Sequence, residues 1–154
     1  NNKKNINKMS IETLINYSKY KNIRNKRIVL TILFIMSLSP MFLNQYGGSR
    51  GVQEISGLIN ILNPLGVLSI LMFIFGVWFP FKNNIINKVL GGCGVLGIVI
   101  SEIYNYFTWY IANITGKFSL YNSIQFAFPE FYIGLLISIM MVFIYFFIDK
   151  IIKE

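Results

Sequence analysis

Four long apolar segments, separated by short polar ones, dominate the chain. They cover residues 27–46, 63–81, 89–111 and 131–148. Each is close to the roughly 20 residues that a helix needs to cross about 30 Å of hydrocarbon. Because lipid cannot satisfy backbone polar groups, and because the alternation typical of a membrane barrel is absent, the segments are predicted to be helices. The predicted fold class is therefore an all-α integral membrane protein, a four-transmembrane-helix bundle that occupies residues 27–154.

The polar segment between the first two apolar runs has a helical pattern of its own. In "GVQEISGLINIL", residues 51–62, apolar residues recur at helical spacing and polar residues lie opposite. The apolar side comprises Val52, Ile55, Leu58, Ile59 and Leu62. This pattern predicts a short amphipathic helix lying in the outer membrane interface. Asn63 as N-cap and Pro64 as first residue are expected to begin the second span, and Pro129 with Glu130 the fourth.

Basic residues are concentrated near the start of the chain. The arm formed by residues 1–26 carries many lysines and arginines but a single acid, Glu12. Such a run directly before an apolar helix is typical of a topology signal and of an anchor for anionic lipid headgroups, with Arg24, Lys26 and Arg27 nearest the membrane. A nucleic-acid-binding patch is the alternative interpretation of the arm, and the position of the arm beside a membrane helix disfavours that interpretation. We therefore expect membrane lipids, and no nucleic acid, as partners of the arm.

The distribution of lysine and arginine over the loops predicts the orientation. With the N-terminus inside, the arm, the loop at 82–88 and the C-terminal tail are basic, whereas the outer loops hold only Arg50 and Lys117. By the positive-inside rule both termini are expected in the cytoplasm. The abundance of Asn, Ile and Lys is typical of an AT-rich genome. The bacterial cytoplasmic membrane is therefore the expected location, with an organelle as the alternative.

Composition excludes several kinds of chemistry. The sequence is 55% hydrophobic and only 13% charged, and it contains no histidine and one cysteine, Cys93. Haem ligation, histidine-based catalysis and His/Cys zinc sites therefore lack the residues that build them. We expect neither a metal nor a cofactor.

The third apolar segment is unusually rich in small residues. Cys93, Gly97 and Ser101 follow one another at four-residue spacing, and Gly94 lies among them. Small residues at this spacing let two membrane helices approach closely. We predict that Cys93, Gly94 and Gly97 form a helix-packing face. The face is expected to pack against a neighbour in the same bundle, and a homodimer contact is the alternative.

Glu102 is the only charged side chain deep inside an apolar segment. An ionised side chain that faced lipid there would cost at least about 2.5 kcal/mol, so the carboxyl group must face protein or water, or hold its proton. Ser101 and Asn105 lie close to it on the same helix, and Asn105, one turn on, is the expected hydrogen-bond partner. Further candidates from across the bundle, in or just before the second segment, are Asn60, Asn63 and Ser69.

Three interpretations of Glu102 stay open. With Asn105 and Ser101 it is a candidate proton or cation site, which is the default hypothesis for a carboxylate inside a membrane. It is also a candidate recognition point for a cationic or hydroxylated ligand from the outer leaflet. The structural alternative is a protonated carboxyl group that hydrogen-bonds within the bundle and fixes the register of its helices.

These features favour a non-enzymatic protein. A general acid and base would need a second acid in the membrane, and Glu102 has none beside it in the sequence. We expect an accessory, immunity or regulatory subunit that acts through intramembrane helix contacts with a membrane-protein partner, or in a homo-oligomer. The alternative is a small subunit of a transport or energy-transducing complex, in which Glu102 binds a proton, a cation or a substrate.

Overall fold

The computed structural model describes residues 2–151, and the side chains of residues 2–150. The ends of the expected domains, residue 1 and residues 152–154, lie outside this range. The elements are α1 (Asn2–Leu38), the 3₁₀ helix η1 (Ser39–Phe42), β1 (Asn44–Tyr46), β2 (Ile55–Ser56), α2 (Ile59–Leu62), α3 (Pro64–Trp78), α4 (Asn84–Tyr110), the π-helical turn η2 (Ile111–Thr115), α5 (Leu120–Gln125) and α6 (Pro129–Ile151). The predominance of helix agrees with the predicted fold class.

Among the described residues, three helical stretches are long and apolar enough to cross a membrane. They are Asn2–Phe42, Asn84–Thr115 and Pro129–Lys150. The helix of the second apolar segment, α3, is shorter. Its 15 residues span about 22 Å, which is less than the roughly 30 Å of a hydrocarbon core. The fold is thus that of a helical membrane protein with three full-length candidate spans and a fourth, shorter apolar helix.

The ends of α3 follow from identifiable residues. The side chain of Asn63 accepts a hydrogen bond from the backbone N–H of Gly66, and Pro64 is the first helical residue, as the sequence predicts. At the other end, Phe79 is extended, with φ −75° and ψ 133°. Proline disfavours the helical conformation of the residue that precedes it. Pro80 therefore ends the helix before Phe79, short of the predicted residue 81.

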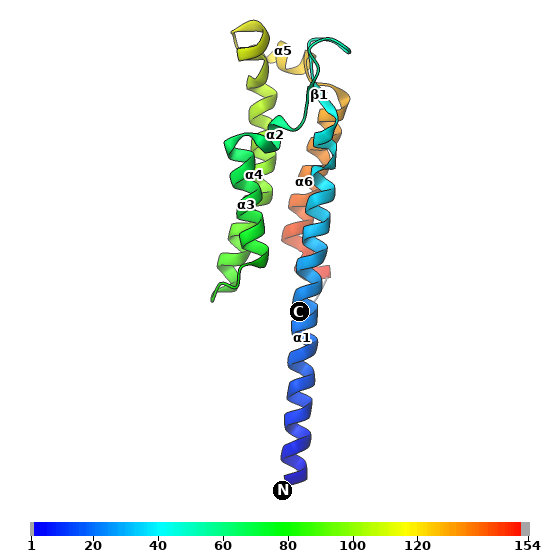
Figure 1. Ribbon diagram of the computed structural model, residues 1–154, viewed down its shortest axis with the longest axis vertical. Coiled ribbons are helices and arrows are strands. Elements are labelled where there is room, and N and C mark those ends of the chain that lie inside the picture. The colour runs from blue at the N-terminus through cyan, green and yellow to red at the C-terminus, as the bar shows by residue number, and fades with distance from the viewer. Residues whose placement is uncertain (1, 152–154) are drawn as a thin grey trace.

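The closest helix pair is α3 with α4, and small residues make it possible. A Cβ atom added at Gly94 would lie 2.6 Å from the backbone nitrogen of Phe73, and one added at Gly76 would lie 2.6 Å from the Cα of Gly91. The two backbones therefore touch at these positions. α4 also packs against α6, and α6 lies beside α1, as Figure 1 shows.

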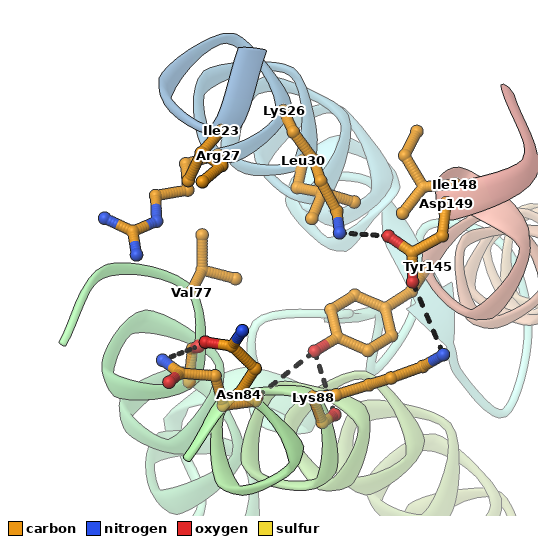
Figure 2. A pocket seen from close by; sticks show the side chains of 12 residues that line it. Ile23, Lys26, Arg27, Leu30, Val77, Asn84, Lys88, Tyr145, Ile148 and Asp149 are labelled. Atoms are coloured by element: carbon orange, nitrogen blue, oxygen red, sulfur yellow. Dashed lines mark hydrogen bonds and ion pairs between the residues drawn. The ribbon is translucent and has the colours of Figure 1, made fainter. Parts of the chain in front are cut away.

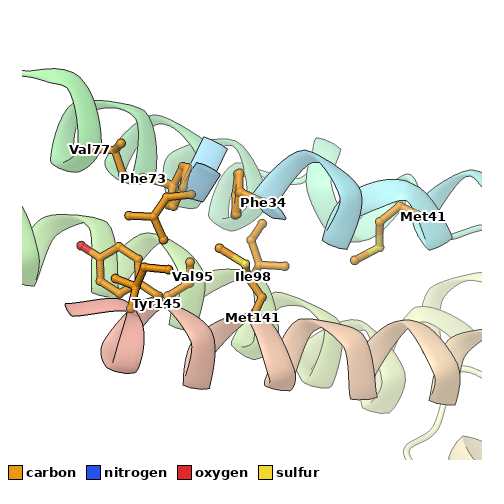
Figure 3. Close-up of a cluster of buried hydrophobic side chains, with 10 residues drawn as sticks. Phe34, Met41, Phe73, Val77, Val95, Ile98, Met141 and Tyr145 are labelled. Carbon is orange, nitrogen blue, oxygen red and sulfur yellow. The ribbon is translucent and has the colours of Figure 1, made fainter. Parts of the chain in front are cut away.

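Aromatic and aliphatic side chains fill the space between the helices (Figure 3). The rings of Phe34 from α1 and Phe73 from α3 stack at 3.9 Å, and Tyr145 from α6 approaches Phe73 edge-on. Val95 and Ile98 supply the α4 side of this cluster. All four long elements therefore contribute to one core.

The first helix is continuous from the arm into the bundle. α1 has 37 residues, a length of about 55 Å, and its first half extends well beyond the other helices (Figure 1). Residues 2–21 of the arm are exposed throughout. Burial begins near Ile23 and is complete at Leu30 and Phe34.

The end of the bundle opposite the arm is covered by connecting segments, and we call it the capped end: β1, β2, α2 and α5 with their loops, residues 43–62 and 116–128 (Figure 1). β1 pairs antiparallel with β2, and Tyr46 forms a further bridge with Ala127. The cap thus joins two loops that are far apart in the sequence.

The predicted amphipathic helix over residues 51–62 is wrong except for its last turn. Residues 51–54 are turn and irregular, Ile55–Ser56 is strand, and only Ile59–Leu62 is helical. Gln53 has a φ of 53°, which a right-handed helix does not allow. Pairing with β1 gives Ile55 and Ser56 backbone partners outside their own segment, and this overrides the helical spacing of the apolar residues.

Candidate functional site

Glu102 lies on α4, facing the interior of the bundle toward α6. Its residue is 1% exposed, although the helix around it presents Ile100, Ile103 and Tyr104 outward. The hydroxyl group of Ser138 on α6 donates a hydrogen bond of 2.6 Å to its Oε1. Its Oε2 is buried and has no hydrogen-bond partner among the described residues. The structure thus places the carboxyl group away from lipid, with one oxygen satisfied and the other not.

The predicted partner Asn105 points elsewhere. Its amide donates a hydrogen bond of 3.3 Å to the carbonyl oxygen of Ile59. The role expected of Asn105 is filled by Ser138, because the bundle brings α6 against this face of α4. Asn105 instead helps to hold α2 against α4.

Ser101, the neighbour of Glu102, is fully buried. Its hydroxyl group donates to the carbonyl oxygen of Asn60 at 2.6 Å and accepts from the amide of Asn63 at 2.7 Å. Asn60 and Asn63, which were expected as partners of Glu102 from across the bundle, thus bond its neighbour Ser101 instead. Ser69, the third candidate, bonds the carbonyl oxygen of Leu65 on its own helix.

A buried polar network lies at the base of the cap. Asn60, which has no exposed surface, accepts a hydrogen bond of 2.8 Å from the hydroxyl group of Tyr46. Its amide donates to the side-chain oxygen of Gln45 at 2.9 Å, and the amide of Gln45 donates to the carbonyl oxygen of Pro40. Gln45 and Tyr46 were not predicted as site residues. They lie at the end of an apolar run, and nothing in the local sequence shows that the chain folds back over them.

Aromatic rings enclose this network on the α4 and α6 side. The ring of Tyr46 lies 5.5 Å from that of Trp109 and 5.2 Å from that of Phe131. Trp109 is 5% exposed, and its indole N–H is a second buried group without a hydrogen-bond partner in the part of the chain that the structure describes. Trp109 and Glu102 are seven residues apart, so they lie on one face of α4, two turns from each other.

A surface ion pair fastens the cap to α6. Both terminal nitrogens of Arg50 bond the carboxylate of Glu130, at 2.9 and 2.7 Å, and the guanidinium lies 4.4 Å above the ring of Phe128. The hydrogen bonds to Glu130 raise the pKa of Arg50 above its already high ordinary value. Bidentate geometry of this kind fixes direction as well as distance. The hairpin tip is therefore attached to the first turn of α6.

The small-residue face of α4 serves packing inside the chain. Gly94 and Gly97 are buried against Phe73 and Ser69 of α3. Cys93, by contrast, is exposed. The face packed against α3 therefore includes Gly94 and Gly97 but not Cys93.

The predicted lipid-anchoring residues lie at the end of the bundle opposite the cap. Lys26 forms an ion pair with Asp149 of α6, and Arg27 lines the same cavity as Lys26. Arg24 is exposed. These basic residues are joined by Lys88 of α4, which also reaches Asp149. We call this region the basic end.

The chemistry available near Glu102 is narrow. Ser138 is its one hydrogen-bond partner within the described chain, and in residues 2–150 no three His, Cys, Asp or Glu side chains gather in a way that could hold a metal ion. The arrangement can bind or release a proton, or accept a hydrogen bond at Oε2. Comparison with protein-family models, with curated proteins and with solved structures finds no match to this chain.

Proposed function

We propose that the protein is a non-enzymatic accessory or regulatory subunit, in the class that also contains immunity proteins, and that it acts on a partner within a bacterial cytoplasmic membrane. In this proposal all four apolar helices lie in the membrane, the basic end and both termini face the cytoplasm, and the capped end faces outward. The charge distribution supports this orientation, because the basic arm and Lys88 lie at one end. The short α3 fits a bilayer when its flanking loops lie in the interface.

The observation that carries the proposal is that the cap combines an ordered polar framework with exposed apolar side chains. Its polar framework is anchored by the Tyr46–Asn60–Gln45 network and by the Arg50–Glu130 pair. Yet large apolar side chains on and beside α5 point outward. These are Phe118, Leu120, Tyr121 and Ile124, which are between 56% and 71% exposed. An ordered scaffold that presents adjacent apolar and aromatic side chains is typical of a protein contact.

The proposed partner surface is therefore the outer face of α5 and not the glycine face of α4. The glycines are already covered by α3. A homo-oligomer through that face would require α3 and α4 to separate. An integral membrane protein that meets Tyr121 and Phe118 at the outer interface fits the exposed residues best.

Cross-linking tests this contact. We expect a photoreactive phenylalanine derivative at Tyr121 to give a discrete adduct with another membrane protein when the chain is expressed in its own host. The matched control is Phe143 on α6, which is 60% exposed on a lipid-facing helix and should give lipid adducts only. The same pattern of adducts from both positions would contradict a partner at α5.

A second candidate function rests on Glu102. Its Oε2 is buried without a partner among the described side chains, and an unsatisfied buried acceptor costs about 1–3 kcal/mol. Such a group is a candidate proton or cation site in a transport or energy-transducing complex. In this case the cap and α6 would position the carboxyl group for transfer.

The variant Glu102→Gln separates the two functions. Because the amide oxygen still accepts the hydrogen bond from Ser138, we expect a stability loss below about 1 kcal/mol, or roughly 2–4 °C in melting temperature. The adduct at Tyr121 should persist under the accessory role. A subunit that couples protons or cations would lose its activity while remaining assembled. Ser138→Ala is the control for the hydrogen bond alone, since it leaves the carboxyl group in place.

A further inference from the structure

A cavity of about 220 Å³ lies at the basic end, between α1, α3, α4 and α6 (Figure 2). Its polar wall comes from three separate helices. Lys26 and Arg27 belong to α1, Lys88 to α4, and Tyr145 and Asp149 to α6. It is distinct from the Glu102 region, which lies nearer the cap, more than three helical turns further along α4 than Lys88.

The charges that line the cavity do not balance. Within the part of the chain that the structure describes, Lys26, Arg27 and Lys88 supply three cations to the lining, and Asp149 is its only acid. Both lysines share this one carboxylate: Lys26 bonds Oδ1, and Lys88 lies 3.4 Å from Oδ2. Among the described residues that line the cavity, cations therefore outnumber acids.

Two of the cations are available to an anion. The 3.4 Å separation between Lys88 and Asp149 exceeds the usual 2.7–3.2 Å of an N–H···O hydrogen bond, so this contact is loose. Arg27 has no hydrogen-bond or ion-pair partner for its guanidinium among the described residues, and Figure 2 shows it directed away from Asp149. A guanidinium suits bidentate contact with a phosphate, and an ammonium adds a point charge.

The size and position of the cavity restrict the kind of ligand that it can bind. The volume of about 220 Å³ is below the roughly 300–1,000 Å³ of pockets for drug-sized ligands, so a small charged group fits and a large organic molecule does not. Tyr145 is held against α4 by a hydrogen bond of 2.9 Å from its hydroxyl group to the carbonyl oxygen of Lys88. Leu30, Val77 and Ile148 form an apolar wall beside the charges. Charges next to an apolar wall at the end of membrane helices suit a phosphate attached to a lipid.

We propose that the basic-end cavity binds a phosphate group through Arg27 and Lys88, with Lys26 and Asp149 forming the back of the site. A phosphodiester lipid headgroup and a soluble phosphate share this chemistry. The inference extends beyond the proposed partner contact, because it concerns the opposite end of the bundle and does not depend on α5 or on Glu102.

The test is native mass spectrometry of the full chain released from vesicles of phosphatidylcholine mixed with phosphatidylglycerol. We expect one retained phosphatidylglycerol, whose headgroup is anionic, and no retained phosphatidylcholine, because its choline cation cancels the charge of the phosphate and is repelled by the cations of the site. Arg27→Gln and Lys88→Gln should each lower the retained fraction about tenfold, as the loss of one charge-assisted contact predicts. Asp149→Asn should raise it, because a competing carboxylate is removed.

Controls make the result specific to the cavity. Lys150→Gln removes a cation next to Asp149 that does not line the cavity, so it should leave retention unchanged. Arg27→Gln leaves the ion pairs of Asp149 in place, so a loss of lipid retention in this variant cannot be attributed to unfolding through broken ion pairs. If millimolar inorganic phosphate stabilises the parent protein in neutral detergent but not the Arg27→Gln variant, the site binds phosphate and its ligand is a soluble one. Equal retention in Arg27→Gln, Lys88→Gln and Lys150→Gln would overturn the proposal.

Discussion

Replacing Gly94 by alanine is expected to destabilise the folded protein by about 3 kcal/mol, at the upper end of the usual range for overpacking. The added Cβ would lie 2.6 Å from the backbone nitrogen of Phe73 and 2.7 Å from the carbonyl oxygen of Ser69. Backbone atoms cannot rotate away as a flexible side chain can, so α3 and α4 must separate. The measurement is the fraction of monomer that survives heating in mild detergent, followed by size-exclusion chromatography.

The matched control is Gly48→Ala in the cap. There the nearest atoms to an added Cβ are the side-chain oxygen of Gln53 at 3.6 Å and a methyl group of Ile114 at 3.8 Å, which are ordinary contacts. This variant should have the same melting temperature as the parent protein. A Gly94→Ala variant as stable as Gly48→Ala would show that α3 and α4 are not in contact as described.

Asn60→Ala is expected to cost about 2–6 kcal/mol. The substitution leaves the hydroxyl group of Tyr46 and the side-chain oxygen of Gln45 buried without the partners they now have, and each unsatisfied group costs about 1–3 kcal/mol. The measurement is again thermal stability in detergent. Asn44→Ala, which removes an exposed amide bonded to Glu54, is the control and should change stability little.

A double-mutant cycle sharpens this result. In the background of Asn60→Ala, the further change Tyr46→Phe removes the hydroxyl group that lacks a partner. We therefore expect the double variant to lose less stability than the sum of the two single variants, since the residues share one hydrogen bond. Strict additivity would mean that Tyr46 and Asn60 are not coupled.

Much of the helical framework is predictable because its signals are local. Asn63 and Pro64 begin α3, and Pro129 begins α6 with Glu130 in its first turn. These signals depend on side chains within one turn of the helix end, which a linear sequence displays directly. The length of α3 was overestimated because the apolar run continues through Pro80, where the helix has already ended.

The cap is not predictable in the same way, because distant residues determine it. β2 exists through its pairing with β1, Tyr46 bridges Ala127, and Arg50 bonds Glu130, which is 80 residues further along the chain. The helical spacing in residues 51–62 is real, but these partners outweigh it. Local periodicity cannot reveal backbone pairing with a segment that lies elsewhere in the chain.

Around Glu102, the local sequence predicts the burial of the carboxyl group but not its hydrogen-bond partner. The isolation of Glu102 within an apolar run predicts that its carboxyl group is buried inside the bundle, and the structure places it there. Its partner Ser138 lies on α6, and the rotation of α6 about its axis depends on side-chain packing along the whole helix. Asn105 was expected because sequence spacing reports only neighbours on the same helix.

The uninterrupted course of α1 has a mechanical consequence. Lys26 and Arg27 sit on the same rigid rod that carries Leu30 and Phe34 into the core, with no hinge between them. The described part of α1 before Lys26 is about 36 Å long, so a small tilt at its far end would act on the ion pair with Asp149 and on the stacked rings of Phe34 and Phe73. A displacement of the exposed part of α1 would therefore change the spacing of the helices in the bundle.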